Sequence, residues 1–166
     1  MAKLDLIDRK ILTELMTDAS LPVATIAHRV GLTQTPCWKR IQRLEAEGVL
    51  TRRVAIVDPA HVGLGLTAFV GVEAADHSDA WRSAFLDAIA DMPEIMEVHR
   101  MAGDVDYLLR VVVTDMPAFD GFYRRLTQRV PMKGVTSRFA METVRASTVY
   151  PLIAAPPAND PVPSGR

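Results

Sequence analysis

The chain has 166 residues, 49% of them hydrophobic, which is enough for one domain or two small ones with real cores. Its net charge of −1 excludes a strongly basic protein, but the charge is unevenly distributed. Residues 1–53 hold nine Lys and Arg against six Asp and Glu, a net of +3, whereas residues 54–166 carry a net of −4. This asymmetry favours two separate units, the basic one being the candidate for a polyanionic partner.

Composition also excludes several kinds of site. The single cysteine, Cys37, rules out an intramolecular disulfide and a thiolate metal cage. The first residues lack the charged start and apolar run of a signal peptide, and no stretch of ~18 apolar residues occurs. We therefore expect a cytoplasmic protein with no membrane span.

Three short helices are predicted in the N-terminal part. Apolar residues recur with helical spacing over residues 4–16 and 22–30, and Gly31 then ends the second helix. Thr33 is the expected N-cap of a third helix, which runs to about Glu47. Two helices joined by a tight turn that contains glycine predict a helix-turn-helix, here of the winged type.

The rest of the chain alternates between strands and helices. Short extended segments are expected at residues 49–50 and 54–57, before a break at Asp58-Pro59. The elements predicted after it are a strand at 66–73, a helix at 78–91, strands at 94–101 and 107–114, a helix at 116–130 and a strand at 135–149. This βαββαβ order is typical of ferredoxin-like domains, so the fold class is α+β. Because two helices cover only one face of such a sheet, we expect a dimer or a larger assembly.

A helical wheel divides the third helix into two faces. Cys37, Ile41 and Leu44 share one side, which is the predicted packing face. The opposite side carries amides, hydroxyls and cations, groups that bind base edges in the major groove of double-stranded DNA. Free amides at the helix start can meet a phosphate, and the two arginines after the helix suit the DNA backbone. The candidate DNA-binding residues are Thr33, Gln34, Thr35, Trp38, Lys39, Gln42, Arg43, Arg52 and Arg53.

Plainer interpretations and other functions compete with this one. The basic face is also what an ordinary solvated helix presents, Trp38 can simply cover the helix pair, and Cys37 is better interpreted as a small core residue than as a redox switch. An enzyme is an alternative, since ferredoxin-like domains also occur as catalytic modules. The four histidines, however, lack ligand spacing, and no nucleophile elbow or phosphate-binding glycine loop accompanies them. We expect no catalytic residue, metal or cofactor.

Four stretches resemble the Lrp/AsnC family of feast/famine transcriptional regulators. They are residues 4–12, residues 32–48 (LTQTPCWKRIQRLEAEG), the turn at 103–109 (GDVDYLL) and residues 139–142 (FAME). They follow the family's order and span about residues 3–150. Residues 35–40, 63–69 and 101–104 are most similar to the branch that contains a cysteine-responsive regulator.

The resemblance implies that the second domain is of the regulation-of-amino-acid-metabolism type. Such domains bind a small amino-acid effector between dimers and assemble dimers into tetramers or octamers. The matching effector residues are Met101, Ala102, Gly103, Asp104, Asp106, Val135 and Ser137. Many members have a Thr-x-Thr pair where this chain has Val135 and Ser137, so the resemblance does not fix the effector. The plainer interpretation of the turn is a hairpin whose aspartates cap backbone amides.

These observations predict a sequence-specific DNA-binding regulator that responds to an amino acid and works as a homo-oligomer. The alternative is a DNA-organising protein with weak sequence preference, because family members can wrap DNA. The expected organisation is a DNA-binding domain at 1–53, a strand or hinge linker at 54–63, an effector-binding and oligomerisation domain at 64–150 and a disordered tail at 151–166.

Overall fold

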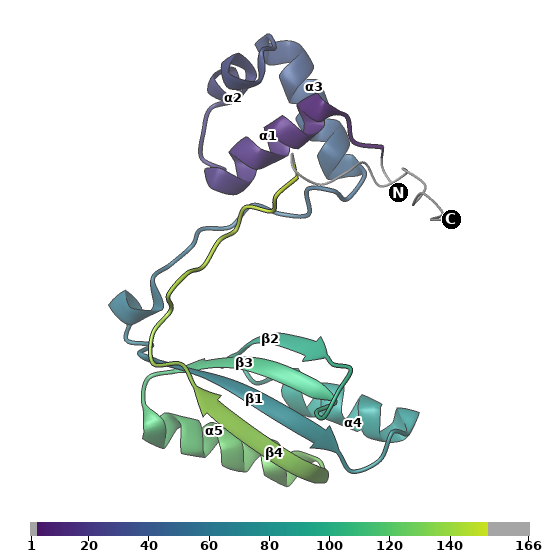
Figure 1. Cartoon of the computed structure of the whole chain (residues 1–166), viewed down its shortest axis with the longest axis vertical. Helices are drawn as coiled ribbons and strands as arrows, with labels where there is room; N and C mark the ends of the chain where they lie inside the picture. Colours follow the sequence, from purple (N-terminus) through teal and green to yellow (C-terminus); the bar gives the residue numbers. More distant parts are fainter. Residues whose placement is uncertain (1–2, 153–166) are drawn as a thin grey trace, which may run out of the picture. The chain divides into compact units, whose positions relative to one another are not determined.

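The computed structural model describes residues 3–152 and divides into two compact units (Figure 1). The first unit contains the chain up to Ala55 together with the segment that starts at Arg145. The second unit is Ile56–Val144. The first unit thus combines the two ends of the described chain, an arrangement that the sequence did not predict.

The first unit contains the three predicted helices, α1 (Leu6–Thr17), α2 (Val23–Val30) and α3 (Gln34–Ala46). A capping box starts α1, and α2 ends at Gly31, whose φ of 75° favours glycine. Apolar side chains from all three helices form one core. Its buried members are Ile11, Leu12, Leu15, Ile26, Ala27, Val30, Cys37, Ile41 and Leu44.

The strand-like segments expected at residues 49–50 and 54–57 are not strands. In the described chain the first strand begins at Leu66, so the helix-turn-helix carries no β wing there. Val54, Ile56 and Val57 are exposed, with no hydrogen-bonded neighbour to make a strand of them. Asp58 caps a short 3-10 helix, η1 (Pro59–Val62), which lies near the start of the second unit.

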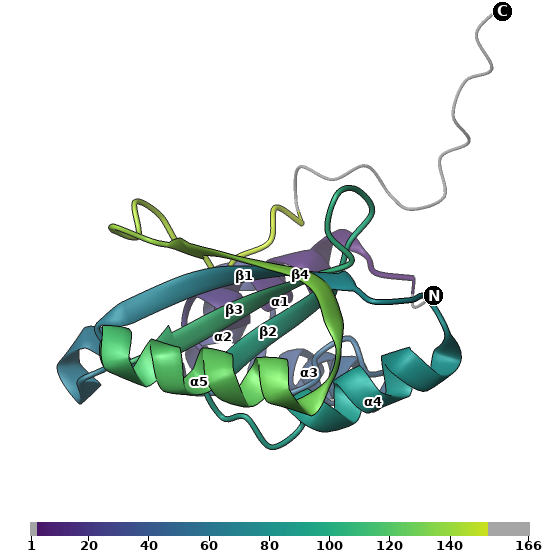
Figure 2. The same ribbon diagram turned by 90° about the horizontal axis from the view of Figure 1, so that it is seen from below.

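The second unit has the predicted βαββαβ order. Its elements are β1 (Leu66–Ala74), α4 (Asp79–Ile89), β2 (Ile95–Arg100), β3 (Tyr107–Val113), α5 (Met116–Arg129) and β4 (Met132–Phe139). The strands form one antiparallel sheet in the order β2-β3-β1-β4. Figure 2 shows α4 and α5 on the same face of this sheet. The ferredoxin-like prediction is therefore confirmed.

Alternation along the strands explains why only one sheet face is covered. In β1, Val70 and Val72 are fully buried beneath the helices, whereas Phe69, directly before Val70, points to the other face and is 38% exposed. Trp81 and Phe85 of α4 stack with ring centroids 5.2 Å apart and pack against Tyr107 of β3. The second face of the sheet lacks such a layer within this unit.

The last strand is shorter than predicted. It pairs with β1 from Met132 to Phe139 and then stops, because β1 itself offers no partner beyond its own first residues. The chain instead returns to the first unit, where Leu152 packs against the helical core. The second unit thus ends before residue 150, and Leu152 of the expected tail is packed; residues 153–166 lie outside the described residues.

Candidate DNA-binding and effector sites

The turn between α2 and α3 positions the candidate DNA-binding helix. Gly31 adopts the left-handed conformation, and the amide of Leu32 donates to the carbonyl of Ala27 over 2.8 Å. The chain then enters α3 at Thr33, which occupies the N-cap position without making a side-chain capping bond. The predicted cap is therefore right in position, but its hydroxyl is left for other partners.

Helix α3 has the two faces that the wheel predicted. Cys37, Ile41 and Leu44 are buried at 1% exposure or less. All nine candidate DNA-binding residues are exposed, and Trp38 next to Cys37 is 51% exposed. Trp38 therefore does not cover the helix pair. Burial raises the pKa of the Cys37 thiol, and the nearby charge of Arg40 lowers it by a smaller amount. The net increase keeps the thiol protonated and unreactive.

The side chains of the exposed face differ in whether they already form hydrogen bonds or ion pairs within the chain. Gln42 donates to Glu45 over 2.9 Å, and Arg53 donates to the same carboxylate over 2.7 Å. Lys39 makes no ion pair with any residue in the range 3–152. The first half of α3 is thus the part of the face that is most open to a ligand.

Arg43 is bound to an acidic group that the wheel did not predict. Its Nη2 donates to Asp8 Oδ2 over 2.6 Å, and Arg40 Nη1 donates to Asp8 Oδ1 over 2.7 Å. The Asp8 side chain is only 1% exposed. Arg40 also donates to Asp5 over 2.7 Å. The hydrogen bonds that Arg40 donates to Asp5 and then to Asp8 raise the pKa of its guanidinium, which stays charged.

The candidate effector turn connects β2 and β3. The amide of Met101 donates to the carbonyl of Asp106 over 2.8 Å, and Gly103 has a φ of 143°. Asp106 has a structural role, since its Oδ2 accepts from the amide of Ala74 over 2.8 Å. Ala102, Gly103 and Asp104 are exposed. The capping interpretation therefore fits Asp106 and leaves Asp104 at the surface.

The two remaining effector candidates lie elsewhere in the sheet. Val135 pairs with Val72 and Ser137 pairs with Val70, so both belong to β4 and face the helix layer. Strand β1 separates β4 from β3, which follows the turn. The effector candidates of one chain consequently fall into two groups on opposite sides of β1.

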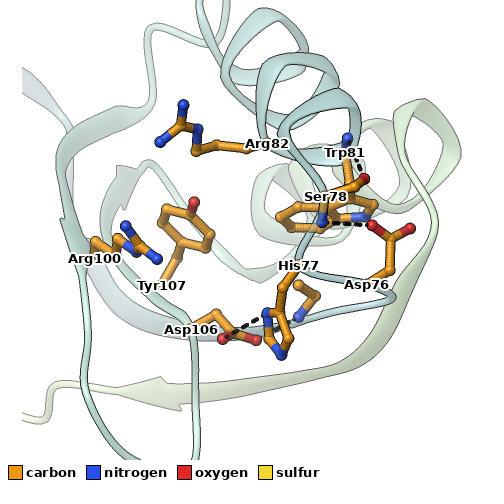
Figure 3. A pocket seen from close by; sticks show the side chains of 9 residues that line it. Asp76, His77, Ser78, Trp81, Arg82, Arg100, Asp106 and Tyr107 are labelled. Carbon is orange, nitrogen blue, oxygen red and sulfur yellow. Dashed lines mark hydrogen bonds and ion pairs between the residues drawn. The ribbon is translucent and has the colours of Figure 1, made fainter.

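A small pocket of about 40 Å³ opens beside the effector turn (Figure 3). In this view Arg82 lies above Tyr107 and Arg100 to its left, and His77 approaches Asp106 with Nδ1 3.5 Å from Oδ1. The lining of the pocket includes one arginine from α4 and one from the end of β2. The sequence interpretation missed Arg82 and Arg100, although Arg100 directly precedes the turn.

No helix between residues 3 and 152 has the length and apolar character required to cross a bilayer. Across the same residues, no three His, Cys, Asp or Glu side chains gather as a metal site requires.

Comparison with known proteins gives matches to both units. The AsnC-type helix-turn-helix domain matches residues 4–45, and the Lrp/AsnC ligand binding domain matches residues 67–150. The chain is 48% identical over 150 residues to the DNA-binding transcriptional activator DecR of Escherichia coli (strain K12), a match that covers 90% of this chain and 99% of DecR.

Two solved structures match most of this chain. An AsnC family transcriptional regulator from Agrobacterium tumefaciens has a TM-score of 0.86 and 48% identity, covering 90% of this chain and 97% of its own. A transcriptional regulator from Neisseria meningitidis in complex with L-Met has a TM-score of 0.85 and 32% identity, with the same coverage.

Proposed function

This chain belongs to the Lrp/AsnC family of DNA-binding transcriptional regulators, which are not enzymes, and we propose that it reads double-stranded DNA with the exposed face of α3. One observation carries the proposal. Helix α3 buries Cys37, Ile41 and Leu44 almost completely, while most side chains on its opposite face are polar, cationic or aromatic. Such a helix after a tight turn has the size and chemistry of a major-groove reader.

The position of each side chain on α3 suggests its role. Recognition helices contact base edges mainly through their N-terminal residues, so we assign Gln34, Thr35, Trp38 and Lys39 to the groove. The uncapped amides at Thr33 suit a phosphate. Gln42 extends the same face, whereas Arg52 and Arg53 follow the helix and suit the DNA backbone. Arg43 stands apart, because Asp8 already binds its guanidinium.

The experiment that tests this proposal compares specific with random binding. Duplexes selected by the full chain from a randomised pool and duplexes of random sequence are titrated across a range of salt concentrations. Sequence-specific regulators bind their sites about 10³–10⁷-fold more tightly than random DNA at physiological salt. We expect a ratio in that range. A ratio near one would favour the DNA-organising alternative.

We further propose that the second unit binds a small amino acid. The relative from Neisseria meningitidis was solved with L-Met, and the Lrp/AsnC ligand binding domain covers most of this unit. Gly103 has no Cβ, which lets backbone amides approach a carboxylate, and the exposed Asp104 suits an α-ammonium group. Arg100 in the neighbouring pocket adds positive charge beside this turn.

The placement of the effector candidates favours a site between two copies of the chain. Because β1 separates Val135 and Ser137 from the turn, a second copy is the simplest way to bring the two groups to one ligand. We propose a homodimer that assembles into a tetramer or octamer, with the uncovered sheet face around Phe69 as the dimer surface. Light scattering on the Phe69→Asp variant tests this surface, and an unchanged mass would reject it.

Effector binding is tested by thermal shift with single amino acids. Cysteine comes first, because the sequence is most similar to a branch with a cysteine-responsive member, and methionine follows. A ligand that binds the folded chain raises the midpoint temperature of its unfolding. If the ligand is the effector, linkage requires that its binding also changes DNA affinity or assembly. If no amino acid changes any of these, the sensing part of the proposal fails. We also propose that the protein works in the cytoplasm, because a DNA-binding regulator must have access to the DNA that it binds.

A further inference from the structure

Among the described residues of the first unit, one carboxylate is buried, that of Asp8 on the side of α1 that faces α3. Asp8 has no exposed surface as a residue, and it accepts hydrogen bonds from Arg43 over 2.6 Å and Arg40 over 2.7 Å. Asp5, one turn earlier, accepts from Arg40 as well and exchanges capping-box bonds with Asp8. We call these four side chains the acid clamp.

From this geometry we propose that Asp8 is a specificity-determining positioning residue for DNA binding, because it keeps the guanidinium groups of Arg40 and Arg43 away from DNA phosphates. The inference rests on the proposed function, in which α3 is the DNA-reading helix. Asp8 itself lies in the core and is therefore not a DNA contact.

The number of cations on α3 explains why a residue such as Asp8 would affect the specificity of DNA binding. The helix carries three cations, Lys39, Arg40 and Arg43, but the acid clamp neutralises two of them with two carboxylates. Lys39 is left as the one cation of α3 without an ion pair among residues 3–152. Each cation that binds a phosphate adds affinity for any DNA sequence, with a salt slope of about −0.9 per contact.

The arginines are close enough to the surface to bind DNA once they are released. The Arg43 side chain is 44% exposed and the Arg40 side chain 30% exposed. A released guanidinium would add sequence-independent affinity, and specificity is the ratio of specific to random binding. The buried Asp8 therefore lowers random binding and also holds the orientation of α3, because both arginines are fixed to α1.

The test uses the full chain with Asp8→Asn and duplex DNA of random sequence. We expect its affinity for this DNA to rise at low salt, and its log–log salt slope to steepen by about 0.9 to 1.8, corresponding to one or two new phosphate contacts. The ratio between a selected duplex and random DNA should fall several-fold. A role in stability alone would lower the unfolding midpoint and leave this slope unchanged, and that result would overturn the proposal.

Two controls separate the clamp from general charge effects. Asp91→Asn also removes one carboxylate and releases one arginine, Arg129, but in the second unit. We expect an unchanged slope there, and an equal steepening would reject the clamp. The double variant Asp8→Asn with Arg43→Gln should have a salt slope about 0.9 shallower than that of Asp8→Asn alone, because one of the released cations has been removed. No recovery counts against the proposal.

Circular dichroism checks whether the variants fold, and DNA titration of one further variant checks the proposed function. If circular dichroism shows that Asp8→Asn does not fold, Asp5→Asn decides the question. It removes one of the two carboxylates that bind Arg40 and should steepen the slope by at most about 0.9. Lys39→Ala tests α3 as the interface independently. A loss of DNA affinity with Lys39→Ala beside an unchanged slope with Asp8→Asn would reject the clamp alone.

Discussion

The guanidinium of Arg9 donates a hydrogen bond to the backbone carbonyl of Leu152 over 2.8 Å, although 143 positions separate the two residues in the chain. Thr148 makes a second bond of this kind, from its hydroxyl to the carbonyl of Met16 over 2.9 Å. Leu152 also packs against the helical core. The segment that follows the effector-binding unit therefore contributes to the DNA-binding unit.

Ending the chain at Val149 should accordingly destabilise the first unit. Loss of the Leu152 contact and of the Arg9 bond is expected to cost about 1–3 kcal/mol. Hydrogen exchange on the α1 amides measures this locally, because opening free energies differ between units. The matched control ends at Leu152 and keeps both contacts. Equal exchange in the two shortened chains would contradict the prediction.

Cys37 and Trp38 are neighbours on α3 and should respond in opposite ways. Cys37→Ser places a hydroxyl in a fully buried apolar site and is expected to lower the free energy of unfolding by about 1–3 kcal/mol. Trp38→Ala changes an exposed residue and should stay within about 0.5 kcal/mol in stability while weakening DNA binding. Urea unfolding and DNA titration of both variants check the pair. An oxidant-sensitive DNA affinity that Cys37→Ser abolishes would contradict the packing role.

Lys39→Ala should weaken DNA binding without unfolding the chain. If Lys39 binds a phosphate, affinity falls for all sequences and the salt slope becomes shallower by about 0.9. If it binds a base edge, the loss is about 1–3 kcal/mol and preference relaxes at one position. Lys10→Ala on α1 is the control, since it removes the same charge from an exposed site outside α3. Equal effects of the two variants would mean that α3 is not the DNA interface.

The two aspartates of the effector turn should separate structure from ligand binding. Asp106→Ala removes the acceptor of the Ala74 amide and is expected to cost about 1–3 kcal/mol. Asp104→Ala changes an exposed side chain and should leave stability nearly unchanged while reducing the thermal shift caused by the amino-acid effector. Thermal melts with and without ligand measure both. A full effector response in Asp104→Ala would exclude this carboxylate from the site.

Acid should destabilise the second unit through Glu97. Hydrogen bonds from Arg110 and then His99 lower the pKa of Glu97, although burial acts in the opposite direction. A carboxyl group whose folded pKa is depressed adds stability above its unfolded value, about 4.3, and loses it as the pH falls through the folded value. We expect the midpoint temperature of unfolding to decrease once the pH is lowered below about 4. This decrease should be smaller in Glu97→Gln. Parallel pH curves for the two proteins would contradict this assignment.

Local patterns in the sequence were sufficient for most of the fold. Apolar spacing located α1, α2 and α3, and glycine after α2 and α3 marked where these helices end. The same spacing assigned Cys37 to the core and Lys39 to the surface. Helices can be predicted in this way because their hydrogen bonds, caps and faces depend on residues only three or four positions apart.

Strand limits and the partners of charged groups were decided by tertiary contacts. Residues 140–149 have an extended pattern, yet β4 ends at Phe139, because a strand needs a neighbour and β1 itself begins at Leu66, close to the Ala68–Phe139 pair. The sequence presented Arg43 as a free base reader, but Asp8, 35 positions away, binds it. Likewise, only the strand order shows that β1 separates Val135 from the effector turn.

By itself, then, the sequence determined the family, the two kinds of unit and the exposed face of α3, all of which depend on short-range spacing and motif order. Only the tertiary structure decided which cations of that face are free, where β4 stops and which unit holds Leu152. These features depend on atoms that are distant along the chain, and an ion pair or a strand pair exists only once folding has brought its two members together.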